Sequence, residues 1–260
     1  MVEVVPFLLL GVFSGFIAGL LGVGGGLIMV PVLLYLLTGS VDQAILMHTA
    51  VGTALAAIVF TSISSVWTHH QHGAIHWHNF RKLMPTILLG AFSGALLTKL
   101  MSFDFMRLFF AFFELTVAVI MYFGFSSSAY VDSLKKRVWR VTGYIIGLVS
   151  AVVGIGGGTM TTPFLTYNKV DIKNAIATSA AVGMPIAVAG ALGFIVAGWN
   201  VENIAEGLGF IHTQALISIV ATSVLFAPLG AKVTHSVDGK KLKKFFAIFL
   251  ALLGINVLSF

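Results

Sequence analysis

A glycine-rich break that occurs twice in an otherwise apolar chain most constrains how this sequence can fold. The first copy is GVGGGLIMVP at Gly22–Pro31, and the second is GIGGGTMTTP at Gly154–Pro163, 132 residues later. That spacing is about half of the 260 residues. Each break therefore belongs to one copy of a duplicated unit, and the fold must contain two related halves.

The composition places both halves in a lipid bilayer. Hydrophobic residues make up 58% of the chain, charged residues 9%, and the mean hydropathy is +1.02. A soluble globule needs more polar surface than this. The formal charge of +6 would suggest nucleic acid for a soluble protein, but the basic residues cluster in short loops between apolar segments. Membrane topology explains that placement, and no nucleic-acid partner is expected.

The sequence predicts an all-α polytopic membrane protein, because its apolar runs are long enough to cross a bilayer as helices and lack strand-length alternation. Four apolar segments precede the midpoint and four follow it. We assign 1–125 to a first repeat of one transmembrane domain, 126–138 to a linker loop and 139–260 to a second repeat. The segments are Val4–Leu37 and Trp139–Tyr167, each interrupted at its glycines, and Gln43–Thr68, Phe80–Leu97, Phe105–Phe125, Lys173–Trp199, Phe210–Val233 and Phe245–Leu258.

Short identities recur in the same order along both halves. Ala50-Val51-Gly52 matches Ala181-Val182-Gly183, and further on Phe110-Ala111 matches Phe246-Ala247. Such similarity along both halves indicates a structural repeat, which is the usual ground plan of secondary transporters.

Charge counting indicates how the broken segments run. If all eight segments cross, six basic residues lie on one side and nine on the other, with little bias. If the two broken segments fold back as re-entrant hairpins, thirteen basic residues lie on one face and only Lys99 and Arg107 on the other. The positive-inside preference favours this second model, with the basic loops around Arg81, Lys135 and Lys240 in the cytoplasm. An odd number of crossings per half then makes the halves an inverted repeat with both termini outside.

The length of the first hairpin arm leaves open the alternative that all eight segments cross. Val4–Leu21 has 18 residues and is long enough to cross unaided, whereas a hairpin arm needs only to reach the middle of the bilayer.

The glycine breaks themselves indicate an interior binding site. Irregular backbone at membrane depth is tolerated only where it is buried in protein or lines an aqueous cavity. Each glycine run also opens a short helix, near Leu27 and near Thr159, whose N-terminus carries partial positive charge. Two such helix ends facing one cavity would select an anion. A nucleotide-binding loop is disfavoured because no strand precedes the glycines, and close helix packing by small residues is the structural alternative.

The chain resembles the TauE/SafE family of sulfite exporters. The resemblance rests on the two glycine motifs, on His48-Thr49-Ala50-Val51-Gly52, on Gly73-Ala74-Ile75-His76-Trp77 and on Ala177-Thr178-Ser179-Ala180, and it covers essentially the whole chain. It implies transport of a small sulfur-containing anion, such as sulfite, sulfoacetate or another organosulfonate. It also implies a bacterial or archaeal inner membrane and coupling to an ion gradient.

The predicted substrate-binding residues are the glycines of the two breaks, the first helical residues after them and polar residues on neighbouring segments. A hydroxyl in a membrane helix can equally bond back to a carbonyl one turn earlier, and that alternative stays open. The predicted residues are Gly24, Gly25, Gly26, Leu27, His48, Thr49, Thr53, Gly156, Gly157, Gly158, Thr159, Thr162, Thr178, Ser179 and Gln214.

Proton coupling and hinge motion have their own candidates. Glu114 is the only acidic residue near the middle of an apolar segment, where carboxyl groups are functional hypotheses by default. It is predicted to carry a coupled proton, with a subunit interface as the alternative, and His48 is a second candidate relay. Pro31, Pro163 and Pro185 are predicted hinge positions, because proline kinks a helix.

No cofactor, metal site or enzymatic activity is predicted. The chain has no cysteine, and the histidines at 69, 70, 72, 76 and 78 lack an acidic partner in their loop. No nucleophile or paired-carboxylate constellation lies in the apolar segments. The predicted partners are a small anion, a coupling ion such as a proton, and the lipid bilayer. An anion channel is the alternative function, and a homodimer is left open.

Overall fold

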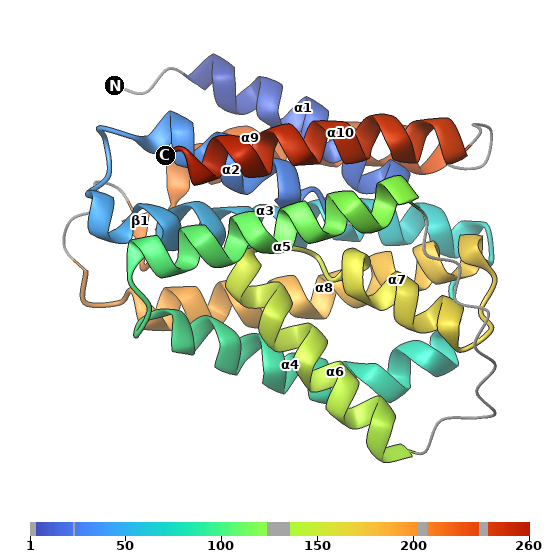
Figure 1. The fold of residues 1–260 in the computed structure, drawn as a ribbon. Helices are drawn as coiled ribbons and strands as arrows, with labels where there is room; N and C mark the ends of the chain where they lie inside the picture. Colours follow the sequence, from blue (N-terminus) through green and yellow to red (C-terminus); the bar gives the residue numbers. More distant parts are fainter. Residues whose placement is uncertain (1–3, 23, 124–135, 202–206, 234–238) are drawn as a thin grey trace.

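The computed structural model describes residues 4–22, 24–123, 136–201, 207–233 and 239–260. Within these residues the chain forms ten α-helices and one two-stranded hairpin (Figure 1). The helices are α1 (Val4–Leu21), α2 (Gly26–Leu37), α3 (Gln43–Gln71), α4 (Trp77–Thr98), α5 (Phe103–Phe123), α6 (Lys136–Val153), α7 (Gly158–Tyr167), α8 (Ile172–Ala197), α9 (Thr213–Val233) and α10 (Gly239–Leu258). The strands are β1 (Gly207–Leu208) and β2 (Ile211–His212), paired antiparallel.

Six of these helices are long and apolar enough to cross a membrane, namely α1, α3, α4, α5, α8 and α9. The predicted all-α polytopic membrane protein is therefore confirmed. α2 and Phe246–Leu258 are shorter apolar helices. α6 has 18 residues, but its first turns carry Lys136, Arg137 and Arg140. Most of the predicted linker lies outside the described residues, and its last three residues belong to α6.

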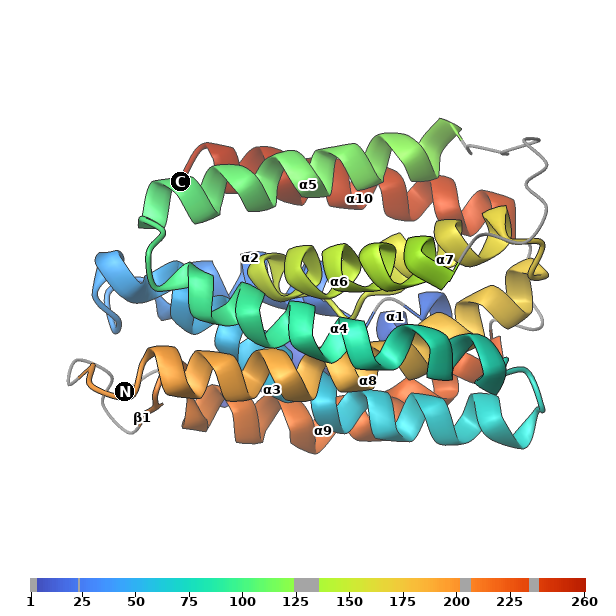
Figure 2. The ribbon, with the colours of Figure 1, turned by 90° about the horizontal axis from the view of Figure 1, so that it is seen from below.

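The chain reverses direction at each glycine break. α1 runs away from the end of the molecule that holds the N-terminus, and α2 returns towards that end (Figure 1). α6 starts at the opposite end and runs inward, and α7 turns back towards its starting end. The N- and C-termini lie at the same end of the bundle in both ribbon views (Figures 1 and 2).

The packing partners of one half recur in the other. α1 packs against α9, and α6 packs against α4. In the same way α3 packs against α9 and α8 against α4, while α3 contacts α8 and α5 contacts α10. The two long helices α3 and α8 are the most buried of the six, since each has neighbours from both halves.

Small residues let the outer helices approach closely. Gly11, Gly15 and Gly19 recur every fourth residue on the side of α1 that faces α9. A Cβ at Gly15 would lie 2.5 Å from the carbonyl oxygen of Ser223. Gly90 and Gly94 of α4 face α6 in the same manner. Close helix packing by small residues, which was the alternative for the glycine breaks, thus operates along these helix pairs.

Aspartate caps start both central helices. The Asp42 carboxylate accepts a hydrogen bond from the Ala44 N–H at 2.9 Å, and the Asp171 carboxylate accepts one from the Lys173 N–H at 3.0 Å. Each cap satisfies one of the four unpaired N–H groups at a helix start. α3 and α8 therefore begin at equivalent places in the two halves.

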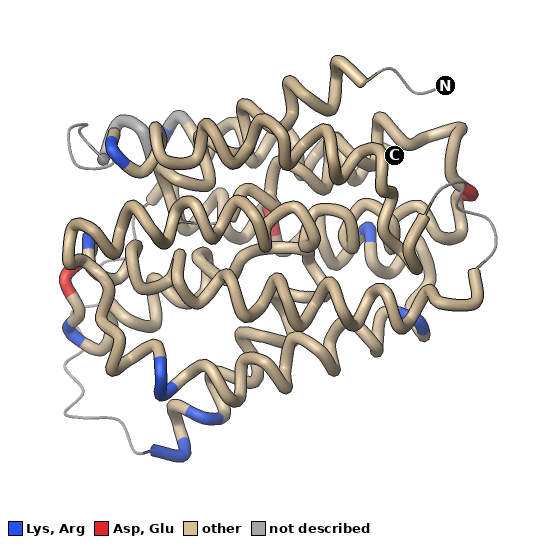
Figure 3. Tube along the Cα trace, turned by 180° about the vertical axis from the view of Figure 1, so that it is seen from behind, with Lys and Arg blue, Asp and Glu red and all other residues tan. Residues whose placement is uncertain are grey.

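Charged residues gather at the ends of the bundle. In Figure 3 basic segments are concentrated at the end opposite the two termini, which is where α4, α6 and α8 begin. Lys99 directly follows α4 and Arg107 lies in the second turn of α5, and these two helices are connected at the end that holds the termini (Figure 1). Lys135 lies outside the described residues, and the side chain of Lys240 is likewise not described.

Candidate functional site

The two glycine breaks meet inside the bundle. A Cβ placed at Gly24 would lie 2.9 Å from the Cα of Gly156, so only a residue without a side chain allows the two backbones to approach this closely. A Cβ at Gly26 would likewise collide with the carbonyl oxygen of Gly154. The breaks predicted from the sequence to lie at one interior site therefore touch each other.

Each break ends in a helix start that is capped by a left-handed glycine. Gly25 precedes α2 with a φ of 79°, and Gly157 precedes α7 with a φ of 74°. Neither cap provides a side-chain hydrogen bond to the N–H groups of the first turn. These N–H groups and the helix dipole give both helix starts, Gly26 and Gly158, partial positive charge.

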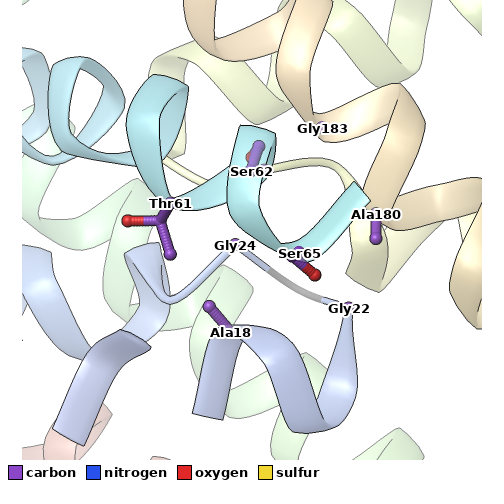
Figure 4. Close-up of a pocket in the computed structure, with 9 residues that line it drawn as sticks. Ala18, Gly22, Gly24, Thr61, Ser62, Ser65, Ala180 and Gly183 are labelled. Carbon is purple, nitrogen blue, oxygen red and sulfur yellow. The ribbon is translucent and has the colours of Figure 1, made fainter. Parts of the chain in front are cut away.

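A small buried cavity lies between the glycine breaks and the two central helices (Figure 4). Its volume is about 10 Å³, which is close to the minimum that holds one water molecule. It is lined by Ala18, Gly22, Gly24, Thr61, Ser62, Ser65, Gly156, Ala180 and Gly183. No lining residue is charged, so backbone groups and hydroxyls make up its polar surface.

Ser65 contributes a buried hydroxyl to the wall of this cavity. Its side chain is 3% exposed, its Oγ has no hydrogen-bond partner, and it points towards the space between Gly22 and Ala180 (Figure 4). The neighbouring Thr61 hydroxyl is already engaged, with the Ala57 carbonyl at 3.0 Å and with Ser223 Oγ at 2.9 Å. An unpaired buried hydroxyl is unfavourable, and a ligand in the cavity would satisfy it.

Sequence reasoning missed Ser65, although a signal was present. Thr61, Ser65 and Thr68 follow one another at intervals of four and three residues, which places them on one face of α3. The prediction instead used positions that match between the halves, and the second half has no counterpart of this hydroxyl row. Of the predicted binding residues, Gly24 and Gly156 line the cavity.

Several other predicted hydroxyls hold the fold together in this state. Thr53 Oγ1 accepts a hydrogen bond from the His212 N–H, and Thr178 Oγ1 accepts one from the His76 N–H, both at 2.9 Å. The two threonines thus tie each central helix to a connecting segment that precedes an outer helix. Thr49 bonds back to the Ile45 carbonyl at 3.0 Å.

Thr162 and Ser179 are brought together by the structure. Their hydroxyl oxygens lie 2.7 Å apart and join α7 to α8. The Oγ1 atoms of Thr159 and Thr161, at the start of α7, are buried without a hydrogen-bond partner. Leu27, by contrast, belongs to the hydrophobic core.

His48 and Gln214 lie on other parts of the bundle. His48 Nε2 is 2.8 Å from the Thr98 carbonyl oxygen, and its ring packs against Phe210 with centroids 4.9 Å apart. Gln214 lies in the first turn of α9 and does not line the cavity.

Glu114 is fully buried in α5, and both of its carboxylate oxygens lack a hydrogen-bond partner. α5 packs chiefly against α10. Glu114 is not among the residues that line the cavity. A coupled proton on Glu114 would therefore not share the cavity with the anion.

The three predicted hinge prolines lie inside helices. Pro31 is in α2, Pro163 in α7 and Pro185 in α8. Each removes one backbone N–H from its helix, which weakens the helix at that point. The first two occupy equivalent positions behind the glycine breaks.

The histidine loop does not assemble a metal-binding group among the described residues, where no three histidine, cysteine or acidic side chains come together. His76 Nε2 instead lies 2.8 Å from the Asn174 amide, and His72 Nδ1 lies 2.8 Å from the Thr68 carbonyl oxygen. Both distances describe ordinary contacts at a helix end.

The fold and its interior site define a polytopic helical membrane protein. The family model described as sulfite exporter TauE/SafE matches residues 7–257. The chain belongs to the TauE/SafE family, as the sequence motifs indicated.

Several curated proteins are similar over nearly their whole length. A probable membrane transporter protein of Haemophilus influenzae is 39% identical over 253 residues, covering 96% of each chain. One from Methanocaldococcus jannaschii is 25% identical over 259 residues, covering 96% of this chain and 94% of its own. YdhB of Bacillus subtilis, also a probable membrane transporter protein, is 27% identical over 271 residues, covering 99% and 100%. No solved structure gives a significant match. These relatives support membrane transport as the function and agree with the expectation that the chain is not an enzyme.

Proposed function

We propose that the protein is a secondary transporter of a small anion, with sulfite or an organosulfonate such as sulfoacetate as the substrate. The observation that carries this proposal is the cavity between the two touching glycine breaks, into which the unpaired Ser65 hydroxyl points. Two helix starts provide partial positive charge near it without any basic side chain. The family name supports a sulfur oxyanion.

Alternating access is the proposed mechanism. The cavity of about 10 Å³ holds roughly one water molecule, so a sulfite or sulfonate group enters only after the breaks and central helices move apart. We propose that the halves form an inverted repeat, and the exchanged packing of α1 on α9 and α6 on α4 supports this. Rocking of one half against the other would then expose the site to each side in turn.

The proposed location is the inner membrane of a bacterium or archaeon, with the basic end of the bundle in the cytoplasm. Positive-inside preference supports this orientation, because most described Lys and Arg lie at the end opposite the termini (Figure 3). Both termini would then lie outside.

Coupling to a proton is proposed to involve Glu114. Loss of a proton from a buried carboxyl without hydrogen-bond partners leaves an unpaired charge in an apolar environment, which is strongly unfavourable. His48 is a second candidate relay, since its Nε2 contacts the Thr98 carbonyl oxygen at the end of α4 while its Nδ1 has no hydrogen-bond partner. Alternatively, we propose that Glu114 lies in the subunit interface of a homodimer that covers α5.

Counterflow in proteoliposomes tests the transporter against a channel. Vesicles preloaded with unlabelled sulfite are diluted into labelled sulfite. We expect the label to accumulate transiently above its equilibrium level, because a carrier exchanges internal for external anion. Simple equilibration without an overshoot would indicate the anion channel, and the absence of any protein-dependent uptake would exclude sulfite as the substrate.

A further inference from the structure

A second, larger hollow lies on the outside of the bundle between α3 and α9. Its volume is about 570 Å³, and it is separate from the glycine site. Three large apolar side chains of α3 line it at intervals of three and four residues, and all are exposed: Phe60, Ile63 and Trp67. Val224 and Pro228 form the opposite wall on α9. The result is an apolar groove on the surface that faces the lipid.

The polar groups inside this groove are satisfied by the protein itself. Pro228 has no N–H and therefore leaves the carbonyl of Val224 without its helical partner. The Ser64 hydroxyl donates to this carbonyl at 2.9 Å across the helix interface. The Thr68 hydroxyl donates to the Ser64 carbonyl at 3.2 Å. An occupant of the groove consequently needs to offer no hydrogen bonds along its length, as is true of an acyl chain.

One end of the groove has a different chemistry. Gln71 and His72 at the end of α3 and Lys232 at the end of α9 line it, and all three are exposed. α3 and α9 end at the basic end of the bundle, which the proposed topology places in the cytoplasmic leaflet (Figures 2 and 3). A cation and polar side chains at this depth complement a phosphate, whereas the remaining length complements hydrocarbon.

We propose that the α3–α9 groove binds one anionic phospholipid, with its headgroup phosphate at Lys232, Gln71 and His72 and an acyl chain along Phe60, Ile63 and Trp67. The charge at one end and the apolar wall along the rest select a lipid over a soluble anion. Because α3 also provides Ser65 to the interior cavity, the lipid would lie against the helix that carries the transport site. The placement of the leaflet rests on the proposed topology, whereas the binding itself does not.

Native mass spectrometry of the purified full-length protein tests the proposal. Phosphatidylglycerol and phosphatidylcholine with the same acyl chains are titrated against the wild type, Lys232→Gln and Ile63→Trp. Lys173→Gln is the charge control, since Lys173 is exposed at the same end of the bundle, and Leu192→Trp is the steric control on α8. Inorganic phosphate is added alone in a parallel series, with thermal stability as the readout.

We expect Lys232→Gln to weaken phosphatidylglycerol binding about fivefold, corresponding to the ~1 kcal/mol that a basic residue contributes near an anionic surface, and to leave phosphatidylcholine binding unchanged. Ile63→Trp should lower the occupancy of both lipids, and both controls should bind like the wild type. Equal affinity of the two lipids in the wild type would overturn the proposal. So would thermal stabilisation by phosphate alone equal to that by phosphatidylglycerol, or a dimer that Ile63→Trp dissociates, which would assign the groove to a second copy.

Discussion

At the scale of single residues, several buried polar side chains lack partners in a bundle whose described hydroxyls are mostly satisfied, and Ser65 and Glu114 are the two to which we give a role in transport. Ser65 faces the interior cavity, and Glu114 lies in α5 with both carboxylate oxygens unpaired. Leaving a buried polar group unsatisfied costs roughly 1–3 kcal/mol. We expect groups that are retained at that cost to find partners in another state of the transport cycle. The serine would then bind the anion, and the glutamate would bind a proton.

Substitution of Glu114 separates proton coupling from exchange. Glu114→Gln mimics the protonated carboxyl and cannot release a proton. We expect net uptake driven by a pH gradient to be lost, because each coupled cycle needs deprotonation, while sulfite counterflow at equal pH persists.

Glu114→Asp is the matched control and should keep gradient-driven uptake with its pH dependence. If Glu114→Gln shows wild-type net uptake with an unchanged pH profile, Glu114 has no part in coupling and its subunit-interface role becomes the better explanation.

At the scale of elements, the glycine breaks turn two apolar segments into pairs of short helices. Their location and their mutual contact follow from the sequence, because both are duplicated and each requires an interior position. The hydroxyls that face the cavity do not follow from the repeat. The hydroxyl-bearing residues that line it, Thr61, Ser62 and Ser65, lie on α3 alone, and which face of a long buried helix turns towards a cavity depends on packing against α8 and α9.

Substitution of two glycines that share one backbone conformation distinguishes the effect of backbone strain from the effect of close backbone contact. Gly24 and Gly39 both have a φ of +81°, but a Cβ at Gly24 would meet Gly156, whereas a Cβ at Gly39 would have nothing within 4 Å. Alanine at either position costs about 1–2 kcal/mol for the left-handed conformation. We expect Gly24→Ala to abolish counterflow and to lower the melting temperature further than Gly39→Ala does.

Gly39→Ala should retain counterflow, since its side chain would point into open space. Equal loss of stability and of transport in the two variants would contradict a close contact between the glycine breaks.

At the scale of the whole molecule, the sequence predicted an all-α membrane protein with broken first and fifth segments, and the helices begin and end near the predicted segments. The differences lie at boundaries: α3 continues to Gln71, α4 begins earlier at Trp77, and α6 begins at Lys136. Polar residues extend these helices beyond the apolar runs, so hydropathy alone could not locate the ends. The external groove at Pro228 also escaped prediction, because it depends on how α9 packs against α3.

The cysteine-free chain allows a direct test of the hairpin topology. Ser40 lies between α2 and α3, and Gly73 lies between α3 and α4. If α1 and α2 form a re-entrant hairpin, a cysteine at Ser40 will be labelled from the outer face together with one at Val2, and a cysteine at Gly73 only from the cytoplasmic face.

Labelling of a cysteine at Ser40 from the cytoplasmic face, with one at Val2 labelled from outside, would show that the first segment crosses completely. The inverted repeat would then be wrong, although the anion site would remain to be tested on its own.

Protection of a cysteine in place of Ser65 is the measurement that tests the anion site most directly. Ser65→Cys provides the only thiol in the chain, and Ser40→Cys, at an exposed position between α2 and α3, is the control. We predict that sulfoacetate slows the reaction of Ser65→Cys with a small thiol reagent in a saturable manner and leaves Ser40→Cys unaffected. Equal labelling rates of Ser65→Cys with and without saturating sulfoacetate or sulfite analogues, in protein that performs counterflow, would contradict an anion site at the glycine breaks.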